Sequence, residues 1–233
     1  MSTLLPTRQA HQLRYGHLVG DLLTLELRNG HRFSQTDAAG TRVEEKETKF
    51  VIAQTTLGVS ENYVVVENIP LSASLRQGEQ EGPLDFSPQR QQLRLLRNGA
   101  RADEGTVEPL AIFVFPEHPL SCGDSWEASL TLNIVDGDPF KASLRCTVSD
   151  LDAEGNVRVA MVSPEISVTS EGRTIQVGVS GRIEFSTAQG TMVHGSLETM
   201  QRCQDDQGES EWIQWLVIQM TDRIGGDEFS IDE

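Results

Sequence analysis

The sequence of 233 residues contains few cysteines and has no long apolar run. Cys122, Cys146 and Cys203 lie far apart and are odd in number, which argues against a disulfide framework or a paired zinc site. We therefore expect them to be buried free thiols. No stretch approaches the ~20 apolar residues of a membrane-spanning helix, so no transmembrane segment is predicted.

Positive charge is also scarce, because 19 basic residues face 35 acidic ones and leave a formal net charge of −16. No dense basic patch is available for a phosphate backbone or an anionic membrane surface, so nucleic acid is not an expected partner. The N-terminus lacks the basic segment and apolar run of a secretory signal. As it stands, the sequence predicts a cytoplasmic protein; if an export signal has been removed, the protein is exported.

A period of two dominates the hydrophobic pattern. Leu23, Leu25 and Leu27 alternate with polar residues, and similar runs recur along the chain. This alternation is typical of strands with one buried face. Residue pairs that favour tight turns punctuate the runs: Asn29-Gly30, Ala39-Gly40, Asp136-Gly137, Glu154-Gly155 and Gln189-Gly190. The chain is therefore predicted to form successive antiparallel hairpins.

The predicted strands span residues 12–18, 21–36, 41–56, 61–69, 90–97, 108–115, 125–135, 140–150, 156–163, 165–170, 173–186, 191–203 and 211–222. The last of these also fits a helical stripe, but β-branched Ile213, Val217 and Ile218 favour a strand with apolar side chains on both faces. The polar, glycine- and proline-containing segment 72–92 indicates a long loop or a crossover. Residues 224–233 carry four acids and no base, which indicates a disordered acidic tail.

A faint internal duplication suggests the overall architecture. His17-Leu-Val-Gly-Asp21 and Leu120-Ser-Cys-Gly-Asp124 each open a long predicted hairpin. We therefore predict a single β domain over residues 1–223, made of two related halves, 12–115 and 116–223. The predicted fold is all-β: a strongly curved antiparallel sheet or partly open β-barrel with few helices.

One local signature carries a family resemblance. The segment Phe115-Pro-Glu-His-Pro-Leu-Ser-Cys-Gly-Asp-Ser-Trp126 is followed by Ile183-Glu-Phe-Ser-Thr-Ala-Gln-Gly190. These segments resemble a group of uncharacterised bacterial β-rich proteins with a Phe-Pro, Pro, Gly-Asp-x-Trp centre and a Phe-Asp-x-x-x-Gly hairpin. Some of those proteins are similar to the half-barrels of lipoprotein carriers. The resemblance implies a fold and no chemistry, and Ser186 departs from it where the pattern has aspartate.

The residues that carry chemistry elsewhere form no recognisable motif here. Asp21 and Asp124 each follow a glycine and precede a strand, where an aspartate can present a carboxylate to a metal but more often accepts hydrogen bonds from turn amides. No metal-binding spacing connects the five histidines, which are His11, His17, His31, His118 and His194.

Nucleophile motifs are missing as well. Ser180 lies inside an alternating run and not in a nucleophile elbow, and Cys122 precedes a glycine as a turn residue does. Gly225-Gly226 lacks the lysine of a phosphate-binding loop. We therefore predict no catalytic residue, no metal and no cofactor.

The aromatic residues leave two interpretations open, since they either line an apolar cavity or fill a core: Trp126, Trp212, Trp215, Phe113, Phe115 and Phe185. In a strand, Trp212 and Trp215 face opposite sides. The preferred hypothesis is a non-catalytic protein that holds an apolar ligand or lipid in a β concavity. The alternatives are a structural or protein-interaction module without a small-molecule ligand and, third, a hydrolase of unidentified type.

Overall fold

The computed structural model describes residues 10–86, 88–100, 114–132, 139–152, 155–170, 173–205 and 208–225. Within these ranges the chain forms strands and no helix, as the period-two alternation predicts. The strands are β1 (Leu22–Asp37), β2 (Gly40–Val59), β3 (Tyr63–Gln77), β4 (Gln80–Pro83), β5 (Gln91–Leu96), β6 (Ser125–Leu132), β7 (Phe140–Leu151), β8 (Asn156–Val162), β9 (Ile166–Ser170), β10 (Arg173–Ser186), β11 (Thr191–Asp205) and β12 (Gly208–Ile224). The predicted all-β class is confirmed.

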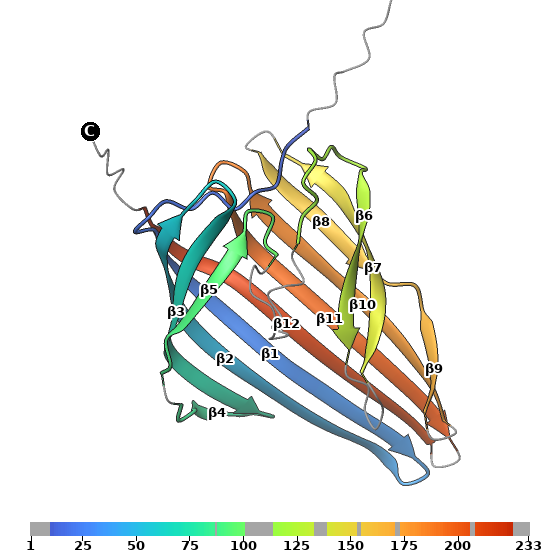
Figure 1. Cartoon of the computed structure of the whole chain (residues 1–233). Helices are drawn as coiled ribbons and strands as arrows, with labels where there is room; N and C mark the ends of the chain where they lie inside the picture. The colour runs from blue at the N-terminus through green and yellow to red at the C-terminus, as the bar shows by residue number, and fades with distance from the viewer. Residues whose placement is uncertain are drawn as a thin grey trace, which may run out of the picture.

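All twelve strands belong to one antiparallel sheet in the order β4-β3-β2-β1-β12-β11-β10-β8-β7-β6, with β5 also paired to β3 and β9 to β10. Figure 1 shows the long strands side by side, with β1 next to β12 in the middle. The path ends at β4 on one side and β6 on the other, so the sheet is not closed into a barrel. The predicted large antiparallel sheet is thus confirmed in its open form.

The register separates the side chains of the sheet into two faces. The pairs Leu27↔Ile218 and Gly195↔Ile218 place these residues on one face, which we call the inner face. The main core lies on it and includes Val159, Val179, Ile183 and Leu216, among others. A smaller core joins β3 to β5 through Val64, Val66 and Leu93.

The sheet curls toward this inner face. Leu93 and Leu95 on β5 line the same small pocket as Ile218 on β12. Along the sheet path, β3, β2 and β1 intervene between β5 and β12. Residues separated by so many strands share a pocket only where the sheet bends, so the interior is concave at this place.

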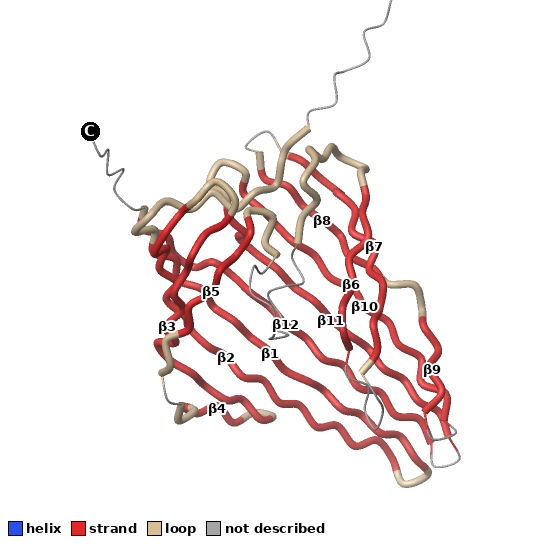
Figure 2. The backbone as a smooth tube through the Cα atoms, in the orientation of Figure 1, coloured by secondary structure: helices blue, strands red, loops and turns tan. Residues whose placement is uncertain are grey.

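Residues 10–20 cross one end of the sheet and are not the strand predicted for 12–18 (tan in Figure 2). Leu13 is fully buried, and the backbone of Tyr15 and Gly16 bonds to Arg97 and Gly190 instead of to a neighbouring strand. The alternation of Leu13, Tyr15 and His17 therefore reflects burial against loops. Only His11 forms a β-bridge, with Leu120.

Other corrections concern polar segments. The predicted loop 72–92 begins too early, because β3 continues to Gln77 and turns at Gly78, with a φ of 58°, into β4. Asn29-Gly30 is not a turn but lies inside β1, where the ring of Trp215 occupies the space of a glycine Cβ. Most of the predicted strand 108–115 and of the acidic tail lies outside the described residues.

The two Gly-Asp turns have the same hydrogen-bond pattern. The amide of Leu18 donates to Asp21 Oδ2 and that of Ser121 to Asp124 Oδ2, both at 2.8 Å. Each aspartate amide donates back to the carbonyl three residues earlier, and the preceding glycines have φ of 88° and 91°. The carboxylates thus accept turn amides as predicted. The division into halves 12–115 and 116–223 remains a prediction.

Candidate functional site

The outer face of the sheet is charged and its charges are paired. Lys49 and Arg28 both contact Glu26 at 2.6 Å, and hydrogen bonding from Lys49 and Arg28 lowers the pKa of Glu26 against the effect of burial. Arg76 pairs with Glu45 and Glu47. Such half-exposed pairs keep a face in contact with water and contribute little to stability.

The inner face has a different character on β1 and β2. Leu25, Leu27, Phe50 and Ile52 form cross-strand pairs Leu25↔Ile52 and Leu27↔Phe50, and we call these four residues the apolar strip. Each is only partly buried. Large apolar side chains that remain partly accessible on a concave face mark a place where a ligand or partner binds.

The strip leads to a small pocket, which we call the apolar pocket, with a volume of about 60 Å³. Its lining includes Leu23, Leu25, Leu93, Leu95, Met192 and Ile218. One wall is polar, since it contains His17, Gln54 and Thr191. Gln54 is occupied there, because its Nε2 donates to Asn68 Oδ1 at 2.9 Å.

His17 is the unsatisfied group of this pocket. Its side chain is 4% exposed, and in the described part of the chain its Nδ1 has no hydrogen-bond partner. The ring stacks on Tyr15, with centroids 5.9 Å apart and planes 4° from parallel. Burial, then the charge of Arg223, lowers the pKa of His17 to about 4, so the imidazole is neutral near pH 7.

A buried ion pair lies beside His17. Asp21 is 0% exposed and accepts a hydrogen bond at 2.8 Å from Arg223 Nη2, near the end of β12. Arg223 also donates to the carbonyl of Gln189 in the turn before β11. The pair thus connects the start of β1, the end of β12 and this turn.

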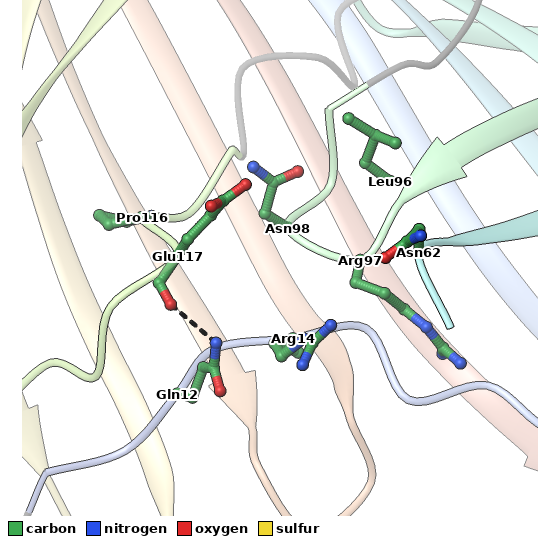
Figure 3. Close-up of a pocket in the computed structure, with 8 residues that line it drawn as sticks. All are labelled: Gln12, Arg14, Asn62, Leu96, Arg97, Asn98, Pro116 and Glu117. Carbon is green, nitrogen blue, oxygen red and sulfur yellow. Dashed lines mark hydrogen bonds between the residues drawn. The ribbon is translucent and has the colours of Figure 1, made fainter. Parts of the chain in front are cut away.

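A second, polar pocket of about 440 Å³ lies at the same end of the molecule; we call it the arginine pocket (Figure 3). Arg14, Arg97, Asn98 and Glu117 are among its lining residues, and Gln12 donates to the carbonyl of Glu117 at 2.7 Å.

Tyr15, which lines the apolar pocket, is hydrogen-bonded to Arg97, which lines the arginine pocket. Its amide donates to the Arg97 carbonyl at 2.8 Å, and Arg97 donates to the carbonyls of Tyr15 and Ser60. Burial, then the nearby charge of Arg14, lowers the pKa of Arg97. The arginine pocket is hydrophilic and suits water or a polar group more than an apolar chain.

The predicted candidates lie apart from one another. His31 is on β1, His194 is on the outer face of β11, and His118 is exposed. No group of three potential metal ligands occurs among the described residues. Ser180 is an exposed residue within β10, as its alternating neighbours predict.

The prediction of buried free thiols is confirmed for Cys146 and in part for Cys203. Cys146 is buried, which raises the pKa of its thiol to about 11, and Cys203 is half-buried. The prediction for Cys122 is wrong, because it is exposed in the turn before Gly123. Its thiol donates to the carbonyl of Ser149 at 3.8 Å at the surface.

The aromatic residues fill a core and also line the open face. Phe115 and Phe185 pack edge to face with centroids 5.1 Å apart, and Trp126 contacts Phe115. Trp212 stacks on His31 at 4.8 Å, whereas Trp215 lies over Gly30 and donates to Glu47. The two tryptophans therefore face opposite sides, as predicted. Phe113 lies outside the described residues.

Sequence reasoning missed the polar wall of the apolar pocket. Gln54 carries no motif and reaches the pocket through the pairing of β2 with β1. Arg223, which pairs with Asp21 beside His17, carries no motif either and comes there through the pairing of β12 with β1. A signal was available for Gln54, since a polar residue at an inner position of an alternating strand indicates either a hydrogen-bonded core residue or a ligand contact. For Arg223 the sequence offers no comparable signal.

No protein-family model and no curated protein matches the sequence. Among solved structures, the fold is similar to that of lipovitellin, whose structure concerns lipid–protein interactions, with a TM-score of 0.55. The alignment has 9% sequence identity and covers 92% of this chain and 26% of that one, so the chain spans about a quarter of the lipovitellin chain. The likeness shows a shared fold. No helix in the described part of the chain is long and apolar enough to cross a membrane.

Proposed function

We propose that this protein is a non-catalytic binding protein whose curled sheet holds the apolar part of a lipid on its inner face. The observation that carries the proposal is the contrast between the two faces of the same strands. The outer face of β1 and β2 carries paired charges, whereas the inner face presents the partly accessible apolar strip and leads into the apolar pocket.

The fold supports this assignment. Lipovitellin has a similar fold, and its structure concerns lipid–protein interactions. Carriage of a lipid chain requires an apolar surface protected from bulk water, and a concave sheet provides it without closing into a barrel. No cofactor, metal or reactive nucleophile is part of the proposal.

The direct test is mass spectrometry of gently purified protein, comparing its native mass with the small molecules released on denaturation. The proposal predicts a stoichiometric lipid or other long-chain compound. If the protein is instead a ligand-free oligomer, it is a structural or interaction module and the proposal fails.

A matched pair of variants locates the site. Ile52 and Val51 are adjacent, β-branched and partly buried, but Ile52 belongs to the inner face and Val51 to the outer one. An asparagine on the inner face leaves an amide without a partner under the lipid chain, at a cost of about 1–3 kcal/mol. Ile52→Asn is therefore expected to weaken binding of 1-octadecene about tenfold, measured by displacement of the neutral fluorophore N-phenyl-1-naphthylamine.

The control Val51→Asn is expected to bind within twofold of the wild type. Circular dichroism and thermal unfolding of both variants establish that they are folded before binding is compared. Equal losses in the two variants would mean that binding does not depend on the inner face.

A further inference from the structure

His17 is the chemically unusual residue of the apolar pocket. It is nearly fully buried and faces a lining in which most side chains are aliphatic. Buried polar atoms in folded proteins almost always have a hydrogen-bond partner, and leaving one without a partner costs about 1–3 kcal/mol. In the described part of the chain, His17 Nδ1 has none.

The His17 ring is packed against an aromatic neighbour. It stacks on Tyr15, which itself meets the ring of Phe185 edge to face at 5.5 Å. Tyr15 is further fixed through its backbone, which is bonded to Arg97 in both directions. Nδ1 is therefore a buried hydrogen-bonding atom without a partner in the described part of the chain, on a side chain that lines the apolar pocket.

We propose that His17 recognises the polar head of the bound lipid, and that this head is uncharged and carries a hydroxyl group. This inference rests on the proposed function and specifies its ligand. The pocket volume of about 60 Å³ exceeds the ~15 Å³ needed for one water and suits a small head group. The chain then extends along the apolar strip, because Leu25 belongs to both the pocket and the strip.

The charges around His17 favour an uncharged head. Arg223 is paired with Asp21, and Arg97 donates to two backbone carbonyls, so both guanidinium groups already have partners. A carboxylate head would have to leave water for this apolar pocket, at a cost of several kcal/mol, without displacing those partners. A hydroxyl carries no charge and has both a donor and an acceptor, so it matches either tautomer of a neutral imidazole.

The test compares three probes with the same length of chain: oleyl alcohol, 1-octadecene and oleate. Each is delivered from the same cyclodextrin carrier and displaces N-phenyl-1-naphthylamine from the full-length protein. The wild type is expected to bind oleyl alcohol about tenfold more tightly than 1-octadecene, as one hydrogen bond to a buried group predicts. Because the ratio of the two affinities is compared between variants, differences in probe solubility cancel.

Three variants assign this preference. His17→Phe keeps an aromatic ring against Tyr15 but removes Nδ1, and it is expected to bind both probes with nearly equal affinity. His17→Gln retains a donor and an acceptor and is expected to keep part of the preference. The control His118→Phe makes the same substitution at an exposed position and is expected to keep all of it.

The outcomes separate this inference from the proposed function. Failure of all three probes to bind the wild type overturns the proposed function. Binding of 1-octadecene with no preference for the alcohol, or a preference that survives in folded His17→Phe, overturns only the role of His17. Oleate binding more tightly than oleyl alcohol overturns the uncharged head.

Discussion

Asp21 and Asp124 occupy equivalent turns but differ in their surroundings. Asp21 is fully buried and paired with Arg223, whereas Asp124 is half-buried and has no ion pair with any residue of the described part. Removing one member of a buried ion pair leaves a charge uncompensated, which typically costs about 3–5 kcal/mol.

Asp21→Asn is therefore expected to lower the free energy of unfolding by at least about 3 kcal/mol, and Asp124→Asn by about 1 kcal/mol. Urea denaturation at pH 7, followed by tryptophan fluorescence, measures both. Similar losses in the two variants would show that Arg223 does not stabilise the turn of Asp21 through its charge.

The titration of His17 predicts a loss of stability in mild acid. Burial and the charge of Arg223 lower the pKa of His17 to about 4, while Asp21 offsets part of this shift. Its ordinary value in an unfolded chain is about 6.5, so between these values the unfolded state binds a proton that the folded state does not. The contribution of the neutral His17 to the free energy of unfolding is fully present above pH ~6.5. It falls by roughly 3 kcal/mol as the pH drops toward 4.

His17→Phe has no such group, so its stability is expected to fall less than that of the wild type between pH 7 and pH 4.5. Urea denaturation at pH 7 and pH 4.5 measures the loss of stability in each protein. Because both proteins have the same carboxylates, the difference between their losses reports the contribution of His17. His118→Phe provides the comparison for an exposed histidine. Equal losses in the wild type and His17→Phe would contradict a buried, neutral His17.

At the level of elements, the contact between β1 and β12 depends on a glycine. A Cβ on Gly30 would lie 2.6 Å from the Lys46 carbonyl oxygen, which is backbone and cannot move aside, and would enter the ring of Trp215. Gly30→Ala is therefore expected to destabilise the protein by about 2 kcal/mol, within the range of overpacking substitutions.

Gly58→Ala is the matched control on β2, because the nearest atom to its added Cβ is 4.0 Å away on Val65. This change is expected to be neutral or slightly stabilising, since alanine restricts the unfolded chain. Thermal unfolding of both variants tests the pair, and the fluorescence of Trp215 reports whether its ring has moved. A neutral Gly30→Ala variant would mean that β12 readily shifts away from β1.

The sequence predicts strands well wherever one face is apolar, as in β1, β10 and β11. The sequence predicts strands poorly where alternation or polarity has a cause other than one buried strand face. Residues 12–18 alternate because they cross the end of the sheet between loops, and the end of β3 is polar because it lies near the edge beside β4. The polar wall of the pocket was predictable only in part, because the polar residue Gln54 at an inner strand position is a signal, whereas the meeting of His17, Gln54 and Thr191 depends on the fold.

At the scale of the whole molecule, the strands at the two ends of the strand order pack on cores of unequal size. The main core draws its fully buried members largely from β7, β8 and β10 and from the segments that cross the end of the sheet. The smaller core has three buried residues, on β3 and β5. Local stability follows buried apolar contacts, so the β2–β3 side is expected to open more readily than β10–β11.

Hydrogen exchange of the ligand-free protein is therefore expected to be faster in β2 and β3 than in β10 and β11. A ligand stabilises the folded state by RT ln(1 + [L]/Kd) against those openings that release it. Oleyl alcohol should accordingly slow exchange mainly in β1 and β2, which carry the apolar strip, and leave β7 and β8 nearly unchanged. Uniform exchange before binding would contradict the unequal cores, and protection elsewhere would mean that the lipid does not lie along the strip.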